Sequence, residues 1–286
     1  MIAYPGREGA HSAVACATLF PSEVPLPLPS FRAVADAVAA REVEYGVLPI
    51  ESSLIGPVTE THDLLWDSPL SIVGQVVLPI RHLLLGATEL PTDAVRVVYS
   101  HPVALDQCRE LLARLPGATV IAMPTTADAA KHVAESGVEG DAAIASDRAA
   151  ELYGLTVLEA DVGDHPEAFT RFVSIATWTR IDRNGLPFRT AFSFVTDHRP
   201  GALHRALEPF ARHGIDLLQL VSRPIRCSAW RYRFDAVLAG HPLDDEVHLA
   251  LAEVRAMTRR LVVVGSYPVE CGRFPDHVAA KEIDDV

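Results

Sequence analysis

The chain of 286 residues is poor in cysteine and in long apolar runs. Its four cysteines, Cys16, Cys108, Cys227 and Cys271, stand far apart and form no CxxC pair. We therefore expect neither a disulfide framework nor a zinc site. We expect the protein to reside in a reducing compartment. No apolar run approaches the roughly 18 residues of a membrane helix, and the N-terminus lacks the pattern of a signal peptide. These absences predict a cytoplasmic protein without a membrane partner.

Basic residues are also few. The chain has 25 basic and 37 acidic residues, which gives a formal net charge of −12. Nucleic acids attract basic surfaces, so a nucleic acid is not an expected partner. The acid is unevenly spread: residues 1–189 carry 24 acidic and 13 basic residues, whereas residues 190–267 carry 8 and 10. At about 150 residues per domain, this change predicts a domain boundary near residue 190.

Short apolar segments alternate with helical patterns over residues 1–180. The expected strands are 1–4, 45–50, 70–78, 95–99, 119–123 and 141–146, and the expected helices are 12–20, 31–41, 59–66, 102–115, 127–136 and 149–153. A proline-rich connection occupies residues 21–29. Such alternation is typical of βαβ units and predicts a mainly parallel sheet.

Polar motifs follow four of these strands, at residues 6–12, 51–53, 100–101 and 125–126. In parallel sheets, ligands bind beyond the carboxyl ends of strands and beside helix N-termini. Each serine or threonine alone is better explained as a helix N-cap. The four motifs together favour a site for a small anionic ligand.

A second pattern begins at residue 190. The expected strands are 190–195, 216–222, 232–239 and 260–266, and the expected helices are 202–213 and 244–258. The order βαββαβ predicts a ferredoxin-like unit. Residues 268–286 have few apolar positions and are expected to form a loose tail.

Several segments, taken in order, resemble prephenate dehydratases that carry a C-terminal ACT regulatory domain. They are Gly6-Arg7-Glu8-Gly9 with Ser12, the run YGVLPIESS at 45–53, Ser100-His101-Pro102, Tyr153-Gly154-Leu155, Thr170-Arg171-Phe172, Arg199-Pro200-Gly201-Ala202-Leu203, Ser222-Arg223-Pro224, and Gly265-Ser266-Tyr267-Pro268. The similarity extends over more than nine-tenths of the chain. The Thr170-Arg171-Phe172 segment matches the dehydratase signature of that family.

The resemblance implies an α/β catalytic domain over residues 1–180, with two lobes like those of type II periplasmic binding proteins. It also implies an ACT domain over 190–267, followed by the tail. The implied reaction is the decarboxylating dehydration of prephenate to phenylpyruvate, water and CO2 in L-phenylalanine biosynthesis. It needs no metal and no organic cofactor. L-Phenylalanine is the implied effector, and the implied assembly is a homodimer or homotetramer.

The resemblance also implies roles for single residues. Thr170 donates a hydrogen bond to the departing hydroxyl, and Arg171 grips a carboxylate through two parallel hydrogen bonds. Glu51 either orients Arg171 or a serine, or is a structural carboxylate, and His101 is either a proton donor or a structural residue. The further implied residues are Ser12 and Ser52 for catalysis, Gly6, Gly9, Ser53, Ser100, Thr126 and Phe172 for substrate, and Gly201, Ala202, Leu203, Ser222, Arg223 and Pro224 for phenylalanine.

The chain departs from the family pattern at six positions, namely Ala10, His11, Ser52, Ala168, His204 and Val221. Two alternatives therefore stay open. One is another prephenate-processing enzyme, either a non-aromatising decarboxylase or a dehydratase of a substituted prephenate in secondary metabolism. The other is a non-catalytic protein that senses an amino acid. The retained Thr170-Arg171 pair favours dehydration.

Overall fold

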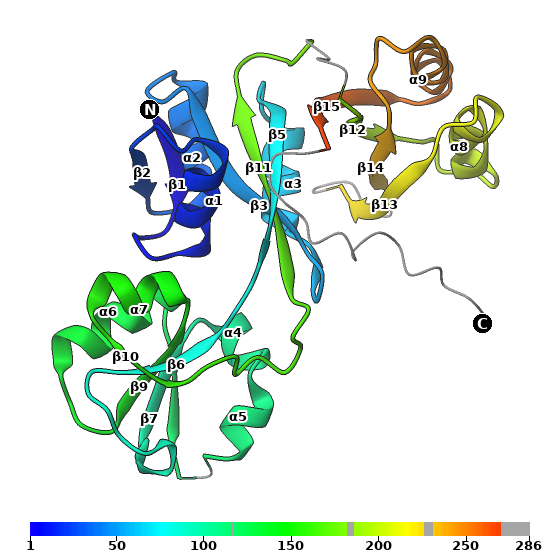
Figure 1. Cartoon of the computed structure of the whole chain (residues 1–286). Coiled ribbons are helices and arrows are strands. Elements are labelled where there is room, and N and C mark those ends of the chain that lie inside the picture. Colours follow the sequence, from blue (N-terminus) through cyan, green and yellow to red (C-terminus); the bar gives the residue numbers. More distant parts are fainter. Residues whose placement is uncertain (116, 182–185, 226–230, 270–286) are drawn as a thin grey trace.

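A computed structural model describes residues 1–115, 117–181, 186–225 and 231–269 (Figure 1). Two lobes and a C-terminal unit lie side by side in it. The chain builds most of the first lobe, crosses to the second, and returns along one strand before it enters the C-terminal unit. Among the described residues, no helix is both long enough and apolar enough to cross a membrane.

The first lobe packs three helices against a mixed sheet. Its elements are β1 (Ile2–Pro5), α1 (His11–Leu19), β2 (Pro25–Leu28), α2 (Phe31–Ala39), β3 (Tyr45–Ser52), β4 (Gly56–Pro57), α3 (Thr59–Trp66), β5 (Ser71–Pro79) and the returning strand β11 (Phe169–Ala176). Strand β11 lies between β5 and β3 and is antiparallel to both. The returning strand therefore sits in the middle of the lobe's sheet.

The second lobe is a separate five-stranded sheet with its own helices. Its elements are β6 (Leu83–Gly86), the 3-10 turn η1 (Thr92–Ala94), β7 (Val97–Ser100), α4 (Pro102–Asp106), α5 (Arg109–Ala113), β8 (Thr119–Ala122), α6 (Thr126–Ser136), β9 (Asp141–Ala145), α7 (Asp147–Tyr153) and β10 (Thr156–Glu159). Two segments cross between the lobes, one after β5 and one before β11 (Figure 1). They meet at an ion pair of Arg81 with Asp161.

The C-terminal unit has the expected βαββαβ order. It contains β12 (Phe188–Val195), α8 (Ala202–Arg212), β13 (Leu217–Pro224), β14 (Tyr232–Ala239), α9 (Asp245–Met257) and β15 (Arg260–Pro268). Its sheet continues into the first lobe, because β15 pairs with β5 in parallel at Gly265 and Ile72. Buried residues of both parts, among them Ile175, Ala191 and Tyr267, share one core.

The mixed α/β class predicted from the sequence is confirmed, but several elements differ, and the strands β6, β10 and β11 were not expected. The first-lobe sheet is not mainly parallel, since β11 opposes its neighbours. Strand β2 lies inside the proline-rich connection, where prolines fit because this edge strand pairs with β1 alone. The helix expected at 102–115 is two helices, because Asp164 accepts hydrogen bonds from the N–H groups of Arg109 and Glu110 and so caps a new start.

Cys16 and Cys108 are buried free thiols, and burial raises the pKa of each to about 12. The other two cysteines and nearly all of the expected tail lie outside the described residues.

Candidate active site

A cavity of about 500 Å³ lies between the two lobes. The first lobe contributes the starts of α1, α2 and α3 and the end of β3, and the second lobe contributes the starts of α4 and α6. The crossing segments supply Ile80, His82 and Ala168, and β11 supplies Phe169, Thr170 and Phe172. The cavity thus has walls from both lobes.

The glycine-rich loop after β1 joins the lobes at one side of this cavity. Ser146 Oγ in the second lobe donates to the carbonyl of Gly9 (2.9 Å), and the Tyr153 hydroxyl donates to the carbonyl of Glu8 (3.0 Å). Arg7 forms an ion pair with Asp128 of α6. A Cβ on Gly9, which has φ +89°, would stand 3.3 Å from the backbone of Ala149, so glycine is needed for this close approach.

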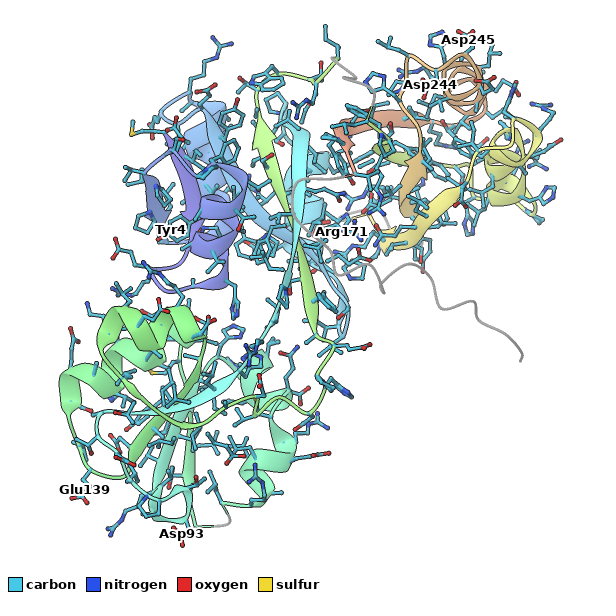
Figure 2. The ribbon with its side chains drawn as sticks, viewed as in Figure 1. Tyr4, Asp93, Glu139, Arg171, Asp244 and Asp245 are labelled. Carbon is cyan, nitrogen blue, oxygen red and sulfur yellow. The ribbon has the colours of Figure 1, made fainter. Side chains whose placement is uncertain are left out.

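Strand pairing decides which signature residues reach the cavity. Side chains alternate between the two faces of a strand. Thr170 pairs with Ser52 across β11 and β3, and both line the cavity. Arg171 pairs with Glu51, and both line a different cavity of about 230 Å³ on the opposite face. Figure 2 shows Arg171 on the side of β11 that faces the C-terminal unit.

Five helices, α1, α2, α3, α4 and α6, begin at the cavity. The side chains of Ser30, His101 and Thr125 cap α2, α4 and α6. Helices α1 and α3 follow Ala10 and Val58, which have no side chain that could cap them, and α3 carries the carboxylate of Glu60 in its first turn. The first N–H groups of a helix carry partial positive charge and have no partner within the helix. The start of α1 can therefore bind an anionic group of a ligand.

Three histidines line the cavity, and burial lowers the pKa of each. The pKa of His11 falls to about 4, because burial and the nearby His82 both disfavour the charged form. Nε2 of His82 lies 2.9 Å from Gln107 Oε1. At neutral pH these rings are uncharged hydrogen-bonding groups, so they are weak proton donors.

Permanent positive charge is missing from the described lining. Among the described residues around the cavity there is no lysine or arginine, and Glu60 is a carboxylate. Recognition of an anion inside the cavity must therefore depend on helix starts and hydroxyl groups.

The structure brings together part of the predicted site. The predicted site residues that line the cavity are Gly6, Ser12, Ser52, His101, Thr126, Thr170 and Phe172. Arg171 and Glu51 lie outside it, because their side chains are on the opposite face of β11 and β3. Gly9 contacts the second lobe, as described above.

Two predicted hydroxyl residues serve the backbone rather than the cavity. Ser53 Oγ accepts a hydrogen bond from the N–H of Phe169 (2.9 Å). Ser100 is fully buried, and its Oγ donates to the carbonyl of Ile144 (2.6 Å). The cap of α4 expected at Ser100 is instead His101, whose Nδ1 accepts from the N–H of Val103 (3.2 Å). Neither serine lines the cavity among the described residues.

The residues expected to bind phenylalanine lie on two elements of the C-terminal unit. Gly201 precedes α8, and Ala202 and Leu203 line a cavity of about 490 Å³ beside it. Ser222, Arg223 and Pro224 lie on β13. One Arg223 nitrogen is 3.3 Å from an oxygen of Asp63 in α3, so this segment also contacts the first lobe.

Sequence reasoning missed several lining residues, chiefly His82, Gln107, Glu60 and Phe31. His82 and Gln107 are 25 positions apart, and no local pattern shows that they form a pair. Phe31 and Glu60 open helices that were expected, and their place at helix starts was the available signal.

The fold and site define an α/β protein with a ligand-sized cavity between two lobes and a βαββαβ unit joined to one of them. The family model for prephenate dehydratase matches residues 2–179. A bifunctional chorismate mutase/prephenate dehydratase of Aquifex aeolicus is 38% identical over 243 residues, which cover 85% of this chain and 66% of that protein. The chain belongs to the prephenate dehydratase family.

Two further comparisons extend over nearly the whole chain. Arogenate dehydratase 2 of Petunia hybrida is 35% identical over 285 residues, which cover 95% of this chain and 72% of that protein. The crystal structure of prephenate dehydratase from Arthrobacter aurescens in complex with L-Phe has a TM-score of 0.84 and 28% identity, and covers 93% of this chain and 89% of that one. The similarity therefore includes the C-terminal unit.

Proposed function

We propose that this chain converts prephenate to phenylpyruvate, water and CO2 in L-phenylalanine biosynthesis, and that the reaction takes place in the cavity between the lobes. The observation that carries the proposal is the pairing of Thr170 with Ser52, which sets two hydroxyl groups on the cavity face of adjacent strands. Family membership supplies the reaction class.

The chemistry asks for orientation and modest proton assistance. Loss of the ring carboxylate as CO2 and departure of the 4-hydroxyl together restore an aromatic ring, which drives the reaction. The Thr170 hydroxyl donates a hydrogen bond to the departing oxygen, since the neighbouring histidines are uncharged. The uncapped start of α1, with Ser12 in its first turn, and Thr126 at the start of α6 receive the substrate carboxylates.

Regulation belongs to the same proposal. Residues 1–180 form a two-lobed catalytic domain of the periplasmic-binding-protein type, and residues 190–267 form an ACT domain that binds L-phenylalanine. The family resemblance, the βαββαβ order and the likeness to a structure in complex with L-Phe support this assignment. The assembly is a homodimer or homotetramer, and the protein acts in the cytoplasm.

The test is product identification. Purified protein is incubated with prephenate at neutral pH, beside an enzyme-free blank, and the product is identified by absorbance and mass. Phenylpyruvate is the expected product. A non-aromatic keto acid would instead indicate a decarboxylase, and unchanged prephenate would indicate a binding protein. A parallel incubation with arogenate shows whether the amino acid is the preferred substrate.

A further inference from the structure

A chain of polar contacts runs behind the catalytic strands, on the face of β3 and β11 away from the cavity. Arg171 Nε donates to Glu51 Oε2 (3.1 Å), and an Arg171 Nη1 nitrogen donates to Gln75 Oε1 on β5 (2.9 Å). Arg171 and Glu51 are the direct neighbours of Thr170 and Ser52 in sequence. Contacts that fix the side chains of Arg171 and Glu51 therefore also fix the backbone that carries the hydroxyl groups of Thr170 and Ser52.

The C-terminal unit is bonded to this chain of contacts at both ends. Gln219 Nε2 on β13 donates to the second oxygen of Glu51, Oε1, at 2.7 Å. At the other end, Gln75 Nε2 donates to the carbonyl of Val269, directly after β15 (2.9 Å). The Glu51 carboxylate thus has one oxygen bonded within the first lobe and the other bonded to the C-terminal unit.

The hydrogen bond from Gln219 to Glu51 is strengthened by its partly buried, charged surroundings. The side chains of Glu51 and Arg171 are 32% and 26% exposed, so their contacts are partly shielded from water. Hydrogen bonds to a charged acceptor are stronger than those between neutral groups. Strand β13 is an edge of the sheet and has no direct pairing with β3, so the Gln219 side chain is a specific link between strands that the backbone leaves unpaired.

We propose that Gln219 is a positioning residue for the reaction: it fixes Glu51, Glu51 fixes Arg171, and this pair sets Ser52 and Thr170 on the cavity face. Gln219 does not line that cavity and acts through its neighbours. The catalytic unit thus extends across the domain junction. This inference rests on the proposed function for its kinetic consequence, though not for its structural one.

A charge series at one position separates positioning from packing. Gln219→Leu removes the donor, Gln219→Glu sets a second carboxylate against Glu51, and Gln219→Lys restores a donor with opposite charge. We expect kcat to fall about tenfold in Gln219→Leu and at least as much in Gln219→Glu, with KM within about twofold, while Gln219→Lys keeps most of the activity. Leu220→Ala, an exposed neighbour on the same strand, is the control and leaves kcat unchanged.

Amide hydrogen exchange supplies a readout that does not need turnover. We expect faster exchange at Thr170–Phe172 in Gln219→Leu than in wild type or Leu220→Ala. Equal kcat in the leucine, glutamate and wild-type proteins, or unchanged exchange in Gln219→Leu, would overturn the inference. Absence of prephenate turnover by the wild-type protein would instead refute the proposed function and leave the exchange result to decide this one.

Discussion

At the scale of single residues, two neighbours in the dehydratase signature face different cavities. Thr170 lines the cavity between the lobes, whereas Arg171 lies behind it between Glu51 and Gln75. The expectation of a carboxylate clamp at Arg171 followed from the family resemblance and from residue chemistry, since a guanidinium fits a carboxylate well. In the structure, the carboxylate that the Arg171 guanidinium contacts is that of Glu51.

This placement changes the outcome expected for Arg171→Lys. An ammonium group can bond Glu51 or Gln75 but cannot reproduce both contacts of the guanidinium. We expect kcat to fall about tenfold and KM for prephenate to stay within about twofold, because no substrate contact is lost. Steady-state kinetics decides the matter. A tenfold rise in KM at unchanged kcat would instead indicate that Arg171 binds a carboxylate of the substrate.

The buried His11 predicts a pH effect on folding. Its pKa is about 4 in the folded protein and about 6.5 when unfolded, so between these values the unfolded chain binds more protons. His11 is buried in its neutral form, so protonation of the unfolded chain lowers the free energy of unfolding. The contribution of His11 to stability is fully present above pH 6.5 and is lost as the pH falls toward 4. The loss from this residue is about 2–3 kcal/mol.

The comparison for His11 is the variant His11→Phe. Denaturant unfolding of both proteins between pH 7 and pH 4 should show a steeper decline for the wild type. Parallel stability curves for the two proteins would contradict the assigned pKa. Titrating groups away from this position are common to both chains, so the difference reports His11 together with its interaction with His82.

The residue chemistry of the cavity could be predicted in part from the sequence. Ser12 and Thr126 could be found because each lies at the start of a helix that follows a strand. The face of Arg171 could not be found, since a shift of one residue in register turns every side chain of a strand over. A register shift between Arg171 and Phe172 in the β11–β3 pairing makes such counting less secure still.

At the scale of elements, the junction between β15 and β5 depends on one glycine. A Cβ on Gly265 would lie 2.3 Å from the carbonyl oxygen of Ile72 and 2.5 Å from its nitrogen. These are backbone atoms, which cannot rotate away as a side chain can. The parallel contact between the two strands therefore requires that position to have no side chain.

Gly265→Ala should separate the two strands. We expect the free energy of unfolding to drop by about 2–4 kcal/mol, measured by denaturant titration. Gly117→Ala is the matched control, because a Cβ there meets nothing within 4 Å, and it should stay within about 0.5 kcal/mol. Equal stability of Gly265→Ala and wild type would show that the junction adapts freely.

Local patterns fixed some elements well and others not at all. The helix Thr59–Trp66 and the strand Tyr232–Ala239 have the predicted bounds. Strand β11 was not expected, because its pairing partners in β3 and β5 are about a hundred residues earlier in the chain. Sequence periodicity reports local structure, whereas the position of β11 follows from long-range packing.

At the scale of the whole molecule, charged groups connect the C-terminal unit to the first lobe. Asp63 on α3 lies 3.3 Å from an Arg223 nitrogen and 3.0 Å from an Arg233 nitrogen. The same helix begins at the cavity, where Val58 and Glu60 form part of the lining. A shift of β13 on effector binding can therefore reach the cavity rim through α3.

The effect of phenylalanine tests this connection. Millimolar phenylalanine should inhibit the wild-type enzyme and bind in calorimetry. Asp63→Asn should bind phenylalanine with similar affinity but raise the concentration for half-inhibition at least about fivefold, because binding is uncoupled from the cavity. Arg212→Ala, which changes an exposed contact with Glu253, is the control. No binding and no inhibition in the wild type would refute control by phenylalanine.

The most direct test of the account as a whole is the kinetics of Thr170→Val, a change that keeps the shape of the side chain and removes its hydroxyl. Phenylpyruvate formation and the Kd for prephenate are measured for both proteins, with Thr170→Ser as the variant that restores the hydroxyl. The account predicts that kcat falls by about 10²–10⁴-fold in Thr170→Val, that Kd stays within about threefold, and that Thr170→Ser recovers much of the rate. Wild-type turnover by Thr170→Val would contradict it.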